Sequence, residues 1–450
     1  MTSRLKLLLR RFLRGEGGAI AVIFALTLIP LLLAMGVAID GARAYMLKSQ
    51  LQALADAATI SAGADPFNNS KTALDAVVSA YINANKPTGN DVQVRIRNTT
   101  YEAEEQRYTL LLEGIMNTAF MKIANFDTLT IVAEAQILRA LPGPIELSMA
   151  LDITTSMNFP LMQTTTCEVD GSSVTTQITA LRCGFSTLLD DLSQLVTASS
   201  SEKIKVGVVP FGNRVNVGVD KARSPWLATA TNAFWSTWTG CVGYRRDDRR
   251  ATIIEPTTLP YPLVPGGFSC PRIDRRIVPL TEIWEEEDRD RLKSVLAGTL
   301  SAATEGSASY IPAGLIWAWH VLDNSGPESI FTEGRTDQEL EEVKGKKVIV
   351  LFTDGWNNTG PTSANAGTAL LLSGIANANT TQETLCNNIK SEGIELFVVS
   401  FLLVSNPTEE GRLMSCASSA RHFFKVQTAQ QLIDAFRNVA LSFRPVRLTD

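Results

Sequence analysis

The sequence predicts an α/β protein with an N-terminal transmembrane helix, a small strand-rich module and a doubly wound parallel-sheet domain that carries a disulfide-stapled insertion. Three observations lead to this prediction. Residues 18–39 form one uncharged apolar run, residues 92–133 contain short apolar runs that suit strands, and strand-like and helix-like segments alternate from residue 145 onward. Alternation of that kind favours a parallel sheet with helices on both faces.

The composition is that of a globular protein with little material for acid–base chemistry. The 450 residues are 45% apolar and 19% charged, and a chain of this length holds about two to three domains. The net charge of −5 provides no overall basic field, so we expect no nucleic-acid partner. The two histidines, His320 and His422, are too few for a His-rich zinc centre, which leaves oxygen-ligand metal binding or protein interaction.

The apolar run 18–39 is predicted to span a membrane once. As a helix it is roughly 30 Å long, the thickness of a bilayer hydrocarbon core, and the proline within it, Pro30, is tolerated in membrane helices. Five basic residues precede the run: Arg4, Lys6, Arg10, Arg11 and Arg14. Because positive charge stays on the cytoplasmic side, we expect residues 1–17 to be a cytoplasmic tail and the chain beyond Asp40 to lie outside.

A cleaved signal peptide is the main alternative for this run. Signal peptides have an apolar stretch of about 7–15 residues with a small-residue cleavage site directly behind it. Here the stretch is longer, and the nearest convincing site, Ala62-Gly63-Ala64, lies far beyond its end. Pilin-type processing is disfavoured because no acid follows a glycine early in the run, and the arginines disfavour a buried soluble helix. We therefore expect a retained anchor.

The helix is expected to continue past the membrane with one apolar stripe. Its side chains recur every three to four residues: Ala44, Leu47, Leu51, Leu54, Ala55 and Ala58. The stripe needs a partner surface, either this chain's own downstream module, which we favour, or a helix of another protein.

That module, within residues 40–140, is predicted to be a small α+β unit. A helix is expected over 71–84, and strands are expected over 92–96, 108–112 and 129–133. The module contains no catalytic constellation, so a spacer or pilin-like role is favoured. The Leu141-Pro142-Gly143-Pro144 segment marks its end, because two prolines and a glycine interrupt regular structure.

The beginning of this region resembles a known family. The segment GAIAVIFALTLIPLLLAMGVAIDGARAYMLKSQLQALADAATISAGA, which starts at Gly18, is similar to the N-terminal region of Tad/Flp-pilus assembly proteins of the TadG type. The Asp40-Gly41-Ala42-Arg43 turn and the Ala-rich stretch behind it carry the likeness together. The resemblance implies a role in the biogenesis of adhesive pili, with TadE-like minor pilins or other pilus-assembly proteins as partners.

Residues 145–450 are predicted to form one α/β domain. Its strand candidates are residues 145–151, 203–210, 346–352 and 394–401, and its helix candidates are residues 178–198, 315–322, 382–392 and 429–441. The last two strand candidates are nearly continuous apolar runs, typical of parallel strands buried on both faces. Ligands of such sheets bind outside the carboxyl ends of the strands.

Oxygen-bearing side chains stand at three such places. Asp152, Thr154 and Ser156 follow the first strand, Asp354 follows the third, and Ser309 precedes the helix that starts near residue 315. Carboxylates, hydroxyls and water are the ligands of hard cations, so we expect a divalent cation, Mg²⁺ first and Mn²⁺ or Ca²⁺ as alternatives. The alternative interpretation is structural, with Asp152 and Ser156 capping a following helix.

This constellation resembles the metal-ion-dependent adhesion site of von Willebrand factor A (vWA) domains, written Asp-x-Ser-x-Ser, a downstream Thr and a later Asp. Asp152, Thr154 and Ser156 match the first element with one Thr for Ser, Ser309 takes the Thr position, and Asp354 matches the last element. Both departures keep a hydroxyl. The resemblance implies that a carboxylate of a partner protein completes the metal's coordination, and that the site is adhesive rather than catalytic.

Residues 212–280 interrupt the alternation and are interpreted as an insertion. They hold Trp226, Trp235, Trp238 and the mixed-charge run 245–250. Long excursions within a compact domain are usually functional or flexible. The composition leaves two interpretations open, a protein interface of aromatic residues and arginines or a local core stapled by a disulfide.

The cysteines predict an oxidising compartment. All six follow the apolar run, at Cys167, Cys183, Cys241, Cys270, Cys386 and Cys416. An even number confined to the exported part predicts three disulfides. Among the 15 connectivities that six cysteines allow, we favour sequential pairing. The absence of a CxxC pair disfavours zinc ribbons and thioredoxin-like chemistry.

Together these features favour a non-enzymatic, TadG-like protein of the bacterial inner membrane. It would have a cytoplasmic N-terminus, a single span and a periplasmic vWA domain that binds a cation and a partner protein. Two other functions stay open: a periplasmic vWA chaperone of a non-pilus complex, and a metal-dependent hydrolase that uses Asp152 and Asp354. The hydrolase is the weaker of these, because no general base, nucleophile elbow or Gly-rich phosphate loop is recognisable.

Overall fold

The structure is a computed structural model of the chain, and its parts are described as two units. It describes residues 17–63, 70–87, 91–102, 107–139, 143–194, 204–245, 250–254, 256–265, 270–301, 304–360, 374–401, 406–443 and 446–449. Nearly all of the predicted cytoplasmic tail lies outside these residues. The first unit comprises Met1–Ala140 and Pro445–Asp450, and the second comprises Leu141–Arg444.

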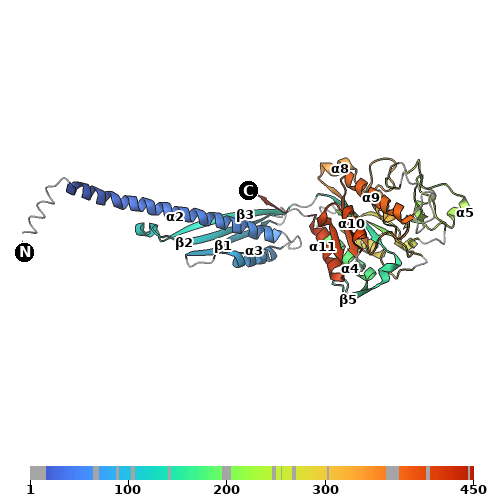
Figure 1. Ribbon diagram of the computed structural model, residues 1–450, viewed down its shortest axis with the longest axis horizontal. Helices are drawn as coiled ribbons and strands as arrows, with labels where there is room; N and C mark the ends of the chain where they lie inside the picture. The colour runs from blue at the N-terminus through green and yellow to red at the C-terminus, as the bar shows by residue number, and fades with distance from the viewer. Residues whose placement is uncertain are drawn as a thin grey trace, which may run out of the picture. The chain divides into compact units, whose positions relative to one another are not determined.

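The first unit combines one long helix with an antiparallel sheet (Figure 1). Helix α2, Gly17–Gly63, continues without interruption from the apolar run and is long and apolar enough to cross a membrane. The remaining elements are α3 (Lys71–Asn85), β1 (Val92–Glu102), β2 (Arg107–Asn117), the short 3₁₀ helix η1 (Met121–Ala124), β3 (Thr128–Arg139) and β14 (Val446–Thr449). The strand order is β1-β2-β3-β14. All three strands predicted from sequence are present and extend further than their apolar runs.

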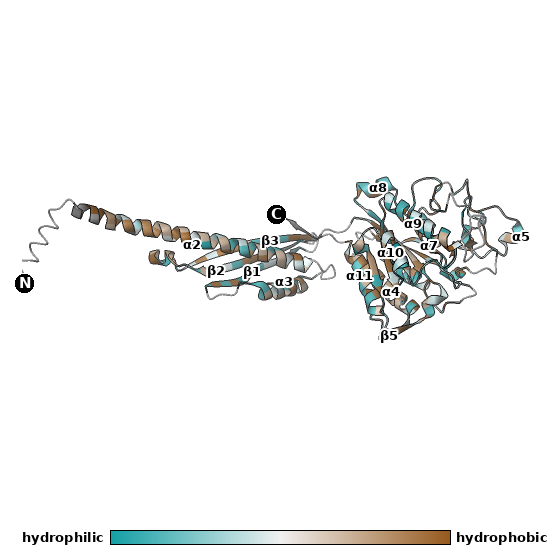
Figure 2. Ribbon diagram, in the orientation of Figure 1, coloured by the Kyte–Doolittle hydropathy of each residue, from teal (hydrophilic) through white to brown (hydrophobic). Residues whose placement is uncertain are grey.

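The apolar stripe of α2 packs on this chain's own module, as favoured. Leu47, Leu51, Leu54, Ala55 and Ala58 are buried. They share one core with α3 and with the inward-facing residues of β2 and β3. The second half of α2 is therefore part of a protein core, whereas most apolar side chains of its first half are exposed. Figure 2 shows that first half in hydrophobic colours.

The last strand belongs to the first unit, although the sequence grouped it with the α/β domain. Val446 pairs with Arg139 and Thr449 with Gln136, so β14 forms an antiparallel edge of the first sheet. The second unit is thus inserted between two neighbouring strands of the first. A four-residue strand carries too little pattern to reveal its partner, so only the fold places it.

The second unit contains a six-stranded sheet in the order β10-β7-β4-β11-β12-β13. Its strands are β4 (Ile145–Asp152), β7 (Ile204–Phe211), β10 (Val278–Glu282), β11 (Lys346–Thr353), β12 (Glu395–Phe401) and β13 (Phe423–Val426). All neighbours pair in parallel except β10, which is an antiparallel edge strand that the sequence did not predict. The predicted doubly wound α/β fold is confirmed.

Helices cover both faces of this sheet. Helices α4 (Gln177–Ser193) and α11 (Ala429–Leu441) pack on each other over one face, where Phe352 meets Phe436. Helices α7 (Ile311–Leu322) and α9 (Ile375–Ser391) share a core with the other face. Shorter helices are α6 (Glu286–Ser294), α8 (Asp337–Glu342) and α10 (Pro407–Cys416). Helix α9 begins earlier than predicted. Its first turns are mostly polar, and the buried Ala378 alone provides too weak an apolar pattern to predict a helix there.

The insertion packs most of its aromatic residues into the core of the α/β unit rather than exposing them. It contains β8 (Val215–Asn216), α5 (Asn232–Trp235) and β9 (Cys241–Val242). Trp226 and Trp238 are buried, and Trp226 makes an edge contact with Trp317 of α7 at 5.8 Å between ring centroids. Four residues of the charge run, 246–249, lie outside the described residues, while Arg245 and Arg250 are buried. Trp226 and Trp238 belong to the same core as α7 and the sheet, which disfavours the aromatic-interface interpretation. Among the described residues, the separate cluster at the disulfide holds only Cys241, Val264 and Cys270.

Three disulfides join the cysteines sequentially, the pairing favoured from sequence: Cys167–Cys183, Cys241–Cys270 and Cys386–Cys416. The first ties the ribbon of β5 (Pro160–Thr166) and β6 (Ser173–Thr176) to α4. The second closes the insertion, and the third joins α9 to α10. Each bond therefore closes a local loop at the periphery of the sheet.

Candidate metal centre

Strand β4 brings the first carboxylate to the carboxyl end of the sheet. Leu151 of β4 pairs with Phe352 of β11, so the residues that follow them, Asp152 and Thr353, stand side by side. Asp152 is fully buried. Its Oδ1 accepts hydrogen bonds from the backbone N–H (3.0 Å) and the Oγ1 (2.7 Å) of Thr154, and its Oδ2 accepts one from Thr353 Oγ1 (2.9 Å). These bonds fix the orientation of the carboxylate.

Three hydroxyls converge beside this carboxylate. Thr154 Oγ1 lies 2.9 Å from Ser156 Oγ and 3.3 Å from Ser309 Oγ. Thr154 and Ser309 are buried, whereas Ser156 is half-buried. Thr154 and Ser156 belong to the turn around the 3₁₀ helix η2 (Thr155–Asn158), and Ser309 precedes the first turn of α7. Two segments far apart in sequence thus present hydroxyls to one point.

Asp354 supplies the second carboxylate from the turn after β11. Ser156 Oγ donates a hydrogen bond to Asp354 Oδ1 at 3.1 Å. The structure therefore brings together all of the residues that the sequence suggested for this site: Asp152, Thr154, Ser156, Ser309 and Asp354.

Burial makes both carboxylates costly to ionise. Burial raises the pKa of Asp152, although hydrogen bonds from Thr154, Thr353 and Ser309 oppose the rise. Burial, and then the nearby charge of Asp152, raise the pKa of Asp354 to about 8. A divalent cation placed between them would compensate both charges and favour the ionised forms.

The capping interpretation of these side chains finds little support. The N-cap position of η2 is Thr154, and no side chain caps that helix. The Asp152 carboxylate turns inward to Thr154 and Thr353, and the Ser156 hydroxyl faces Asp354. Asp152 also accepts the backbone N–H of Thr154 at the start of η2. Most of the hydrogen bonds of these side chains nevertheless run between side chains, which suits a shared ligand better than a cap.

The sequence missed three residues that hold the site together. Thr353 donates to Asp152, as described above. Asn358 Oδ1 accepts the N–H of Ser309 at 2.9 Å, and Asn357 Oδ1 accepts the N–H of Ile311 at 2.9 Å. The asparagines thus fasten the segment around Ser309 to the turn after Asp354. The signal that could have identified the two asparagines is their place in the turn that follows Asp354.

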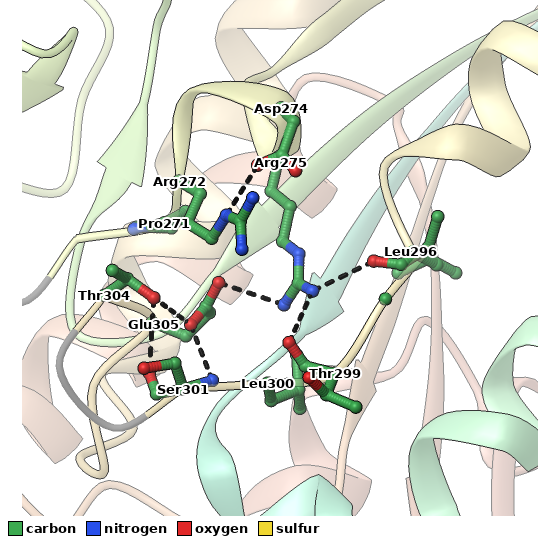
Figure 3. A network of polar contacts seen from close by, with 12 residues as sticks. Pro271, Arg272, Asp274, Arg275, Leu296, Thr299, Leu300, Ser301, Thr304 and Glu305 are labelled. Carbon is green, nitrogen blue, oxygen red and sulfur yellow. Dashed lines mark hydrogen bonds and ion pairs between the residues drawn. The ribbon is translucent and has the colours of Figure 1, made fainter.

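A buried ion pair steadies the loop that leads to Ser309 (Figure 3). Arg275 Nη1 lies 3.0 Å from Glu305 Oε1, with both side chains buried. Glu305 Oε2 accepts the N–H of Ser301 at 2.8 Å, and Arg275 Nη2 donates to the carbonyl of Thr299 at 2.9 Å. The next residue along, Gly306, accepts the N–H of Thr155 at 3.2 Å through its carbonyl. The ion pair thereby anchors a loop that touches the site's own turn.

The donor set fits a hard divalent cation. It combines two carboxylates with three hydroxyls, and these five donors leave one position of an octahedral shell for water or for one external oxygen. Within the described ranges, no group of three or more His, Cys, Asp or Glu side chains comes together. The candidate therefore depends on hydroxyls as much as on carboxylates.

The sheet, its helices and the oxygen-rich rim define a vWA-type domain. The von Willebrand factor type A domain model matches residues 328–438, a range that includes Asp354 but not the other four site residues. Residues 18–65 match the Tad family model of Flp pilus-assembly TadE/G-like proteins. The chain therefore carries a TadE/G-like segment followed by a vWA domain, and the combination predicted from sequence is confirmed.

Solved structures with a similar fold include proteins of pili and of a parasite. The pilus adhesin SpaC from Lactobacillus rhamnosus GG shares 12% identity at a TM-score of 0.42, over 80% of this chain and 35% of that chain. The vWF domain of the type V pili tip protein Mfa5 from Porphyromonas gingivalis shares 11% identity at a TM-score of 0.35, over 67% of this chain and 96% of that chain. Manganese-loaded TRAP protein from Plasmodium vivax shares 9% identity at a TM-score of 0.31, over 70% of this chain and 81% of that chain. A search of curated proteins finds no match.

Proposed function

We propose that this protein is a membrane-anchored vWA protein of Tad/Flp-type pilus assembly that binds a partner protein through a divalent cation. The ligands would be Asp152, Thr154, Ser156, Ser309 and Asp354, with Mg²⁺ as the first choice of cation. The convergence of these five oxygen-bearing side chains at one end of a parallel sheet carries the proposal. The two family matches support the pilus-related part.

The proposed topology places the N-terminus in the cytoplasm and the vWA domain in the periplasm of a bacterial inner membrane. Residues 18–39 would form the single span, residues 40–140 the membrane-proximal module, and residues from 145 the vWA domain with its insertion at about 212–280. The exposed apolar first half of α2 and the basic residues before it support this orientation. The three disulfides suit an oxidising compartment.

A partner carboxylate is the natural external ligand of such a site. Asp354 and Ser156 are only half-buried, so one side of the cluster is reachable from solvent. A hard cation held by two carboxylates retains positive field toward that side and prefers oxygen. We therefore expect the partner, a minor pilin or another pilus-assembly protein, to offer an Asp or Glu side chain.

Binding explains the site better than catalysis does. The five residues supply carboxylates and hydroxyls, and the hydroxyls contact one another or a carboxylate rather than an imidazole. A hydrolase would need a positioned base beside an activated water or nucleophile. The periplasmic chaperone hypothesis has the same cation site as the pilus-assembly hypothesis and differs only in the partner. Identifying the protein that the site captures therefore distinguishes the two.

Calorimetry of the detergent-solubilised full chain with Mg²⁺ and Mn²⁺ tests the cation site. We expect saturable binding to the parent protein and no detectable binding after Asp152→Ala. Asp434→Ala, on the exposed face of α11, serves as the matched control and should bind like the parent. Equal affinity in the parent and Asp152→Ala proteins, with unchanged circular dichroism, would refute the site.

Capture from membranes of the native host tests the partner. We expect the parent protein to retain a Tad-system component in the presence of Mg²⁺ and to release it on addition of a chelator. Loss of the same component with Asp152→Ala ties capture to the cation. Cation-dependent capture of a protein unrelated to pili would support the chaperone hypothesis, and turnover of a substrate by the parent protein alone would support the hydrolase.

A further inference from the structure

The connection between β2 and β3 ends in an exposed apolar tip. We use "β2–β3 tip" for residues 120–126, which include η1. Phe120 is 42% exposed, Ile123 70% and Phe126 57%. Figure 2 shows this short helix and the first half of α2 in the same apolar colour. Water-exposed aromatic and aliphatic side chains gathered at one point mark a contact surface.

The tip lies directly against the part of α2 that is predicted to be in the membrane. A Cβ added to Gly36 would stand 2.5 Å from Phe120 Cβ, so the ring sits where α2 has no side chain. A groove of about 380 Å³ lies alongside, lined by residues of α2 from Leu32 to Ile39 together with Phe120 and Ile123. Every one of its lining residues is apolar or glycine. The tip therefore occupies the same level along α2 as the last two turns of the predicted span.

A buried carboxylate of α2 holds the tip in place. Asp40, one residue past the predicted span, is fully buried. Its carboxylate accepts the backbone N–H groups of Ala119 (2.9 Å), Phe120 (2.8 Å) and Met121 (2.8 Å). Three N–H groups that a short loop would otherwise offer to water are thus satisfied inside the protein.

The rest of the tip's backbone is largely satisfied within the turn. Ile123 donates its N–H to the carbonyl of Phe120, Asn125 to that of Lys122, and Phe126 to that of Met121. An irregular segment enters a bilayer only where its backbone polar groups have partners inside the protein. Six N–H groups of residues 119–126 meet this condition, while the side chains of Phe120, Ile123 and Phe126 are exposed.

We infer that the β2–β3 tip inserts into the periplasmic face of the bilayer beside α2, as a second membrane contact of this protein. The inference rests on the membrane anchor proposed above, and it adds an interaction surface to it. Lipid is the occupant because the groove is continuous with the exposed helix surface that a bilayer would cover. Lys122, exposed within the tip, is placed to extend its amine to the headgroup phosphates.

Two membrane contacts would fix the rotation of the protein about the axis of α2, which a single helix cannot do. A single span leaves a protein free to rotate about the helix axis, whereas an apolar tip beside the span selects one side of α2 to face the bilayer surface. The membrane-proximal module would thus be held close to the bilayer.

Depth-dependent quenching in lipid nanodiscs tests the inference on the full chain. A single cysteine is introduced by Ile123→Cys and labelled with an environment-sensitive fluorophore, since the six native cysteines are all in disulfides. Lipids brominated along the acyl chain serve as quenchers. Leu26→Cys, in the predicted span, is the positive control, and Ile254→Cys, exposed in the second unit, is the negative control. We expect the label at 123 to be quenched at least half as strongly as the label at 26.

The controls separate the two proposals. If the label at position 26 is quenched but the label at position 123 is quenched no more than the label at 254, the tip contact is overturned and the anchor stands. No quenching at 26 overturns the anchor itself. Cross-linking of two copies through position 123 without lipid quenching would assign the tip to a protein interface instead. If Ile123→Cys fails to fold, Phe126→Cys reports on the same surface.

Discussion

At the scale of single residues, the candidate metal centre depends on register as much as on residue type. Asp152 and Thr353 meet because β4 and β11 pair in parallel with Leu151 opposite Phe352. A shift of one residue would turn one of the two side chains to the other face of the sheet. Thr353 therefore acts by orienting Asp152, without needing to touch a cation.

Replacing Thr353 tests this orienting role. Thr353→Val keeps the shape of the side chain and removes the hydrogen bond to Asp152 Oδ2. We expect affinity for Mn²⁺ to fall by about 10–100-fold, the usual effect of removing a residue that orients a metal ligand. Isothermal titration measures it. Thr187→Val, a buried Thr on α4 with its hydroxyl on a helix carbonyl, is the matched control and should keep the parent affinity. Equal losses in both proteins would contradict the orienting role.

At the scale of elements, polar contacts add to the shared apolar core in holding helix α3 on the sheet of the first unit. Helix α3 is held to β2 by the hydroxyl of Tyr108, which donates to Asp75 at 2.7 Å. Lys71 also donates to Asp75, at 2.6 Å. Burial raises the pKa of Asp75, but the bonds from Lys71, Tyr108 and Thr99 outweigh burial and leave this pKa lowered.

The lowered pKa of Asp75 predicts a pH dependence with a definite sign. A group whose pKa is depressed by folding stabilises the fold above its ordinary value of 3.8, and this stabilisation is lost as pH falls through the folded-state pKa. We expect Asp75→Asn to lower the free energy of unfolding of this unit by about 1 kcal/mol at pH 7. The difference should shrink as pH falls below 3.8 toward the lowered folded-state pKa. Thermal melts of both proteins across this range measure it, and a constant difference would contradict the assignment.

At the scale of the whole molecule, the vWA unit is inserted between β3 and β14, neighbouring strands of the first sheet. Both connections to the second unit start from the paired positions Arg139 and Val446. The second unit is therefore linked to the first sheet through two strands rather than one.

Removing the last strand tests what it contributes. A chain that ends at Arg444 lacks β14 and leaves the edge of β3 without its partner. We expect amide hydrogen exchange at 136–139 to accelerate, with the melting of the second unit unchanged, and the open edge to promote self-association. Removal of Asp450 alone is the control. Unchanged exchange at 136–139 after the larger truncation would show that β14 does not stabilise β3.

The sequence by itself determined most of the elements and suggested the residues of the candidate site. Apolar run length predicted α2, strand-to-helix alternation predicted the α/β sheet, and residue type nominated Asp152 and Asp354, because these signals are local and periodic. Only the tertiary structure decided what long-range pairing controls: the placement of β14, the antiparallel edge β10, the burial of Trp226, and the link from Asp40 to the β2–β3 tip. Such contacts join segments far apart in the chain, and their partners leave no periodic trace in either segment.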